Sequence, residues 1–65
     1  MFDRIALKAA MAQQCISIRD LANRSSVGYD TLSKILNTGR EPNIATIGKL
    51  AAALNVSPKD LMKEG

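Results

Sequence analysis

The sequence has no histidine and a single cysteine, Cys15, among its 65 residues. A lone cysteine excludes an internal disulfide, and one sulfur with no imidazole makes no ligand cluster for a metal. The missing histidine also removes the commonest general base of enzymes. We therefore expect no metal, no cofactor and no enzymatic activity. A free thiol favours a reducing cytoplasm, where we expect Cys15 to be a buried packing residue and not a redox sensor.

Aromatic residues and long apolar runs are scarce as well. Phe2 and Tyr29 are the only aromatic side chains, so the core must be aliphatic. No apolar run approaches the length of about 18 residues that a transmembrane helix needs, and the N-terminus has the pattern of an amphipathic helix. A hydrophobic content of 46% is that of a folded chain, and we expect one domain, residues 1–65.

The charge balance does not identify the class of molecule that the protein binds. Nine Lys and Arg residues against six Asp and Glu residues give a net charge of +3. This excess permits binding to nucleic acid, but many other soluble domains carry as much charge.

Apolar spacing and capping signatures predict an all-α domain of five short helices with no strand. Ser17 with Asp20, and Ser57 with Asp60, have the spacing of capping boxes. The predicted helices span residues 3–13, 18–24, 29–36, 44–54 and 58–63. Residues 37–42 read as a loop, in which Gly39 can take a positive φ.

Most of the predicted helices have an apolar stripe that should face a shared core. In helix 44–54 this stripe includes the first residue, Ile44. The other inward residues that we expect are Leu7, Ala10, Met11, Leu21, Ala22, Leu32, Ile35, Ile47, Leu50, Ala51, Leu54 and Leu61.

From Ile16 to Met62 the chain resembles the lambda-repressor-like, Cro/C1-type helix-turn-helix family. The resemblance is carried by an ordered series of segments with matching loop lengths. These are Ser17–Ala22, Ser25–Val27 and Thr31–Asn37, followed by Pro42, Ile47, Leu50–Ala51, Ala53–Leu54, Val56–Ser57 and Leu61. The resemblance implies a sequence-specific DNA-binding regulator whose third helix, about Tyr29 to Leu36, enters the major groove.

The chain departs from the family pattern at several positions. Ser26 stands where the turn usually has glycine, and Cys15 replaces a common glycine before the second helix. Ile18 replaces a glutamine that often touches a phosphate. Met11 and Leu36 replace an Arg–Glu ion pair of several family members. Because both partners have become apolar, we expect these two side chains to meet in the core.

The resemblance also indicates which residues face DNA. Candidates for base reading lie at the start of the third helix; they are Gly28, Tyr29, Asp30, Thr31 and Lys34. Candidates for phosphate contact are Ser17, Arg19, Ser33, Asn37, Thr38, Arg40 and Asn43. Plainer roles stay open for several of them. Asp30 and Lys34 have the spacing of a surface ion pair. Gly28 could be a helix cap and Thr31 a surface hydroxyl, while Arg40 could pair with its neighbour Glu41.

One such module buries little surface, so we expect a homodimer that binds two half-sites of double-stranded DNA. Candidate dimer-interface residues are Leu54, Val56, Pro58, Leu61 and Met62. The small size resembles Cro proteins and repressors of phages, plasmids or mobile elements, with no small-molecule ligand and no membrane partner. The alternative is a protein-interaction module, such as an antitoxin-type subunit, but we expect no toxin-binding extension in a chain that ends at residue 65.

Overall fold

The computed structural model describes residues 1–63, so the last two residues of the predicted 1–65 domain lie outside the described part. The elements, in chain order, are α1 (Arg4–Gln14), α2 (Ile18–Ser25), α3 (Tyr29–Thr38), α4 (Ile44–Leu54) and the 3-10 turn η1 (Pro58–Leu61). None of the described helices is long and apolar enough to cross a membrane.

Side-chain caps fix where the helices begin. The Ser17 hydroxyl accepts from the Asp20 amide at 3.2 Å, and the Asp20 carboxylate accepts from the Ser17 amide at 3.4 Å. The Asn43 side chain accepts from the Thr46 amide at 2.8 Å. Both predicted starts are confirmed, because each cap satisfies an amide that has no partner within its helix.

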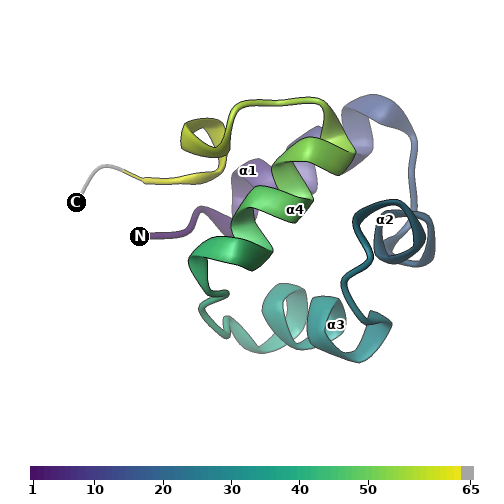
Figure 1. Ribbon diagram of the computed structural model, residues 1–65, viewed down its shortest axis with the longest axis horizontal. Helices are drawn as coiled ribbons and strands as arrows, with labels where there is room; N and C mark the ends of the chain where they lie inside the picture. The colour runs from purple at the N-terminus through teal and green to yellow at the C-terminus, as the bar shows by residue number, and fades with distance from the viewer. Residues whose placement is uncertain (64–65) are drawn as a thin grey trace.

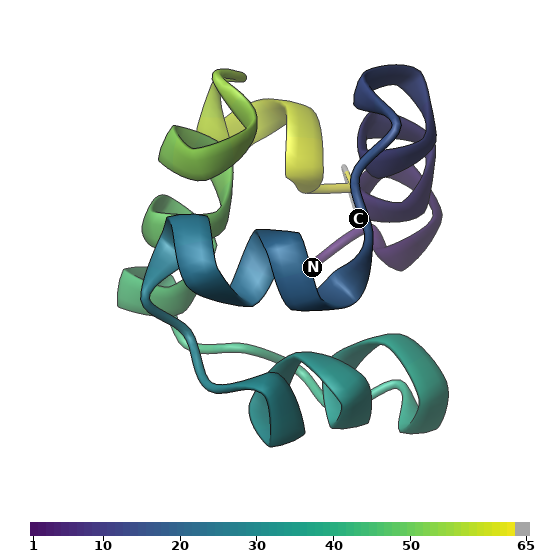
Figure 2. The ribbon, with the colours of Figure 1, turned by 90° about the vertical axis from the view of Figure 1, so that its right-hand side faces the viewer.

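The helices pack around a core of aliphatic side chains and Phe2, so the expectation of a wholly aliphatic core is corrected at that residue. Figure 1 shows α4 crossing in front of α1, with α2 at one end of the molecule and α3 along its lower edge. Figure 2 shows α2 lying above α3, which forms an outer edge of the domain. The fully buried side chains are Leu7, Leu21, Leu32, Ile35, Leu50, Leu54 and Leu61. Met11 and Leu36 are buried in the same cluster and border one surface hollow, as expected for two apolar residues in place of an ion pair.

The two ends of the described chain lie side by side. Phe2 and Met62 form an isolated antiparallel bridge, and the Asp3 amide donates to the Leu61 carbonyl at 2.7 Å. This pairing requires Met62 to be extended, at φ −115° and ψ 141°. The predicted fifth helix, 58–63, begins where expected but is corrected in type and length: η1 is a 3-10 turn that ends at Leu61, and the described residues form four α-helices and this turn.

Two further expectations about the helices are corrected. Helix α3 continues through Asn37 and Thr38, which we expected in a loop, and Gly39 then ends it at φ +73°. Ile44 is 89% exposed and does not join the buried stripe of α4. It is the first residue of α4, and the buried residues of that helix begin with Ile47, one turn later.

Cys15 is exposed, which corrects the expectation of a buried packing residue. It follows α1 in a left-handed conformation at φ 57°, and its amide donates to the Ala12 carbonyl at 3.2 Å. The backbone of Cys15 thus ends the helix in a conformation that glycine adopts more readily.

Candidate nucleic-acid interface

A buried serine holds the turn between α2 and α3. The Ser25 hydroxyl donates to the Leu21 carbonyl at 2.6 Å and accepts from the Val27 amide at 3.2 Å. Ser26 then takes the left-handed conformation at φ 61°, where the family pattern has glycine. Glycine takes this conformation more readily than a residue with a Cβ, so the turn is strained at Ser26. Ser25 was not singled out from the sequence, because a serine in a turn gives no sign of being buried.

Helix α3 has two faces of opposite character. Leu32, Ile35 and Leu36 are buried and attach the helix to the core. The five candidates for base reading are all exposed, on the cap and first two turns of α3; they are Gly28, Tyr29, Asp30, Thr31 and Lys34. The core therefore leaves the start of α3 free to meet a ligand.

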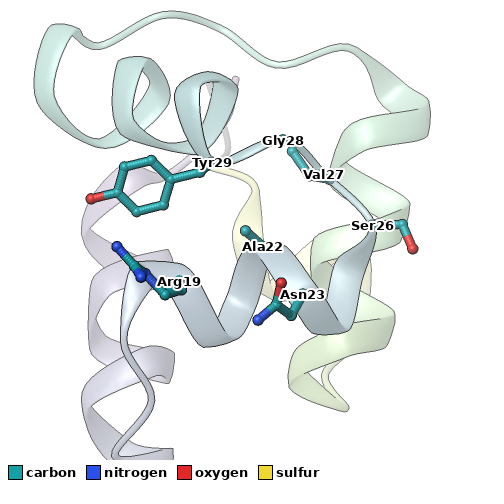
Figure 3. A pocket seen from close by; sticks show the side chains of 7 residues that line it. All are labelled: Arg19, Ala22, Asn23, Ser26, Val27, Gly28 and Tyr29. Carbon is teal, nitrogen blue, oxygen red and sulfur yellow. The ribbon is translucent and has the colours of Figure 1, made fainter.

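Arg19 of α2 and Tyr29 of α3 lie together at the junction of the two helices. The guanidinium carbon of Arg19 is 5.9 Å from the centroid of the Tyr29 ring, within the range of a cation–π contact. Figure 3 shows the end of the Arg19 side chain directed toward the Tyr29 ring at one end of a hollow. Asn23, which was not among the residues predicted from the sequence, lines the same hollow. Its spacing of four residues from Arg19 could have indicated that the two share a helix face.

Three phosphate-contact candidates in the second half of α3, Ser33, Asn37 and Thr38, make hydrogen bonds within the helix. The Asn37 side-chain amide donates to the Ser33 hydroxyl at 3.1 Å, and the Thr38 hydroxyl donates to the Lys34 carbonyl at 2.5 Å. Asn37 and Thr38 are exposed, while Ser33 is half-buried. These contacts hold the side chains of Asn37 and Thr38 back along the helix, against the preceding turn.

The loop before α4 brings two more candidates beside α3. Arg40 and Asn43 are exposed and border one hollow together with Thr31. Neighbouring Glu41 accepts from the Phe2 amide at 2.8 Å, so its carboxylate ties the loop to the N-terminus. Ser17 is exposed but lies at the start of α2, and its hydroxyl is engaged in the capping box.

The predicted dimer-interface residues do not form one free surface. Leu54 and Leu61 are completely buried in the chain's own core, so their side chains are not available to a second copy, which corrects that part of the prediction. Val56 is half-buried, while Pro58 and Met62 are exposed. Within residues 1–63 no three His, Cys, Asp or Glu side chains are grouped in a way that could hold a metal ion.

Comparison with known proteins agrees with this geometry. The sequence model of the helix-turn-helix family matches residues 7–61, from α1 to the end of η1. The chain belongs to the Cro/C1-type helix-turn-helix family. This helix-turn-helix protein is a DNA-binding transcriptional regulator. The family resemblance seen in the sequence is confirmed, and the match covers nearly all of the described residues.

A relative and a solved structure extend the comparison. The helix-turn-helix chain is 33% identical over 58 residues to the SPbeta prophage-derived HTH-type transcriptional regulator YopO of Bacillus subtilis (strain 168). This match covers 89% of the chain and 83% of the relative. The fold is similar to that of the restriction-modification controller protein C.AhdI from Aeromonas hydrophila, with a TM-score of 0.83 and 24% identity. That likeness covers 91% of this chain and 89% of the other.

Proposed function

We propose that this protein is a sequence-specific repressor that reads the major groove of double-stranded DNA with the start of α3. The observation that carries the proposal is the division of α3 into a buried apolar face and an exposed polar first half. Lys34 is suited to donate to guanine, Tyr29 to contact a thymine methyl or a phosphate, and Asp30 to accept from cytosine. The similarity to a prophage-derived regulator supports a repressor of phage or mobile-element type.

The proposed phosphate contacts lie near both ends of α3. Arg19 stands beside Tyr29 at its start, while Asn37, Thr38 and Arg40 lie around its end. Contacts of this kind fix the register of a protein on the duplex without reading its sequence. Three further candidates belong to the same set; they are Ser17, Ser33 and Asn43.

We also propose that the regulator acts as a homodimer, through a face that includes two of the residues predicted from the sequence, Pro58 and Met62. An apolar hollow lies between the start of α4 and η1, bordered by Ile44, Gly48, Pro58 and Met62. A Cβ at Gly48 would meet nothing within 4 Å, so the packing of the chain itself does not require this glycine. Glycine inside a helix destabilises it by about 1 kcal/mol relative to alanine. A second copy that places its own Ile44 in this hollow would explain why Ile44 is exposed and why residue 48 is a glycine.

Selection of binding sites from random duplexes tests the proposed function. We expect a pseudo-palindrome with half-sites about one helical turn, roughly 34 Å, apart. Lys34→Ala should weaken binding and relax the base preference at one position of each half-site. Lys49→Ala is the matched control, because Lys49 is exposed on α4 and is not among the residues that line the hollows beside α3 or between α4 and η1. Binding that ignores sequence, or no binding, would instead favour a protein-interaction module.

A further inference from the structure

A second surface hollow lies where α1, the start of α2 and the end of α3 meet. It is lined mainly by apolar side chains, with one cation at its edge; the residues that matter here are Lys8, Met11, Ile16, Ile18, Leu36 and Asn37. Asn37 is one of the proposed phosphate contacts. The hollow therefore borders the surface that faces DNA under the proposed function.

Two of these lining positions are those at which the chain departs from its family. Met11 stands in place of an arginine, and Ile18 in place of a glutamine that often touches a phosphate. Both substitutions remove polar groups from this part of the surface. Lys8 lies three residues before Met11, on the same face of α1, and is exposed. Its ammonium is the positive charge that this hollow retains.

Arg4 lies one further turn before Lys8, beside the end of α3. Its Nη1 atom is 3.3 Å from the point that a Cβ on Gly39 would occupy, and Gly39 is the residue that ends α3. The last turn of α3 has no basic residue of its own. Two cations of α1 thus stand along the C-terminal half of α3, next to Asn37 and Gly39.

We propose that Lys8, supported by Arg4, contacts phosphates of the DNA strand that passes the end of α3. This inference rests on the proposed function and adds α1 to the binding surface. Lys8 is an exposed lysine at the rim of an apolar hollow. Its ammonium can rotate freely, and the apolar side chains beside it offer no hydrogen-bond acceptor. A polyanion that passes Asn37 supplies the missing partner. The apolar side chains of Met11 and Ile18 cannot bind a phosphate. Lys8, one turn before Met11, supplies a polar group that can.

The salt dependence of DNA binding measures this contact directly. Each phosphate that a protein neutralises on duplex DNA contributes about 0.9 to the slope of log affinity against log salt. We expect Lys8→Gln to reduce that slope by about 0.9 for each protomer bound, measured from about 50 to about 200 mM salt. The probes are a short duplex of mixed sequence and the duplex recovered by selection. Lys8→Arg should keep the slope of the unmodified protein.

Controls separate this contact from charge in general and from folding. Lys49→Gln removes the same charge from α4, at an exposed residue that lines none of the hollows described above, and should leave the slope unchanged. Arg4→Gln should also lower the slope. If it lowers only the unfolding temperature, then Arg4 acts on the end of α3 alone and its part in the proposal is wrong.

The outcomes also distinguish this inference from the proposed function. If the protein binds the selected duplex and Lys8→Gln leaves its salt slope unchanged, the contact by Lys8 is overturned while DNA reading by α3 stands. If the protein binds neither duplex, both proposals fail. If Lys8→Gln and Lys49→Gln reduce the slope equally, the effect belongs to net charge and the contact by Lys8 is also overturned.

Discussion

The guanidinium carbon of Arg19 lies 5.9 Å from the centroid of the Tyr29 ring, which joins the first turn of α2 to the first turn of α3. Tyr29 is 49% exposed, so the core does not fix its ring on all sides. The cation above the ring limits the orientations of a side chain that we place at the DNA surface. Arg19 therefore has two roles in the proposed function, one toward a phosphate and one toward Tyr29.

A double-mutant cycle on DNA affinity tests the coupling between these residues. We expect Arg19→Met and Tyr29→Leu together to weaken binding by less than the sum of the two single changes, with a coupling of about 0.5–1 kcal/mol. Tyr29→Phe keeps the ring and should keep the coupling. Strictly additive effects would mean that the two side chains act on DNA independently.

Ser25 should be the polar residue on which the helix-turn-helix geometry depends most. Ser25→Ala leaves the buried Val27 amide without its acceptor, and we expect a loss of about 1–3 kcal/mol in the free energy of unfolding. Urea denaturation measures this loss. Ser57→Ala, which also removes a local serine hydroxyl but at an exposed position, should have a smaller effect. Equal effects of the two changes would contradict the importance of burial.

Ser26→Gly should stabilise the protein. Ser26 has a φ of 61°, a conformation that is unfavourable for residues with a Cβ, and we expect a gain of about 1 kcal/mol. For a domain of this size, that gain raises the unfolding temperature by about 4–8 °C. Ser33→Gly, the same change inside α3, should lower stability by about 0.5 kcal/mol. Two changes of the same sign would mean that Ser26 is not strained.

Local signals in the sequence were sufficient for most helix boundaries. Capping side chains such as Ser17 and Asn43 act within one turn of the chain, so their effect is visible without the fold. The end of α3 was misjudged because Asn37 and Thr38 are typical of loops. In the structure their side chains bond back to Ser33 and Lys34, and these contacts stabilise a last turn of poor helix formers.

Features that depend on distant parts of the chain could not be read from the sequence. The extended conformation of Met62 exists because Phe2 lies beside it, at the other end of the chain. The exposure of Ile44 likewise depends on which turn of α4 first meets the core. For the candidate site, the family resemblance located the exposed face of α3, but it gave no indication of Lys8 or Arg4, whose roles depend on how α1 packs beside α3.

Ile44→Glu should separate dimer formation from folding. Ile44 is 89% exposed at the first turn of α4, where an acidic side chain is favourable for the helix, so we expect no loss in the unfolding temperature of the isolated chain. A stable interface buries about 800 Å² for each partner, close to a fifth of the 4226 Å² that the chain exposes. An apolar patch of a few residues should therefore give a weak dimer, and one buried carboxylate should abolish it.

Sedimentation equilibrium over a range of protein concentrations measures this effect. We expect the unmodified protein to associate reversibly in the absence of DNA and Ile44→Glu to remain monomeric. Ile5→Glu, at a 69% exposed isoleucine of α1, is the matched control and should leave association unchanged. If Ile44→Glu associates as the unmodified protein does, the second copy binds elsewhere, and the exposed Ile44 and Gly48 need another explanation.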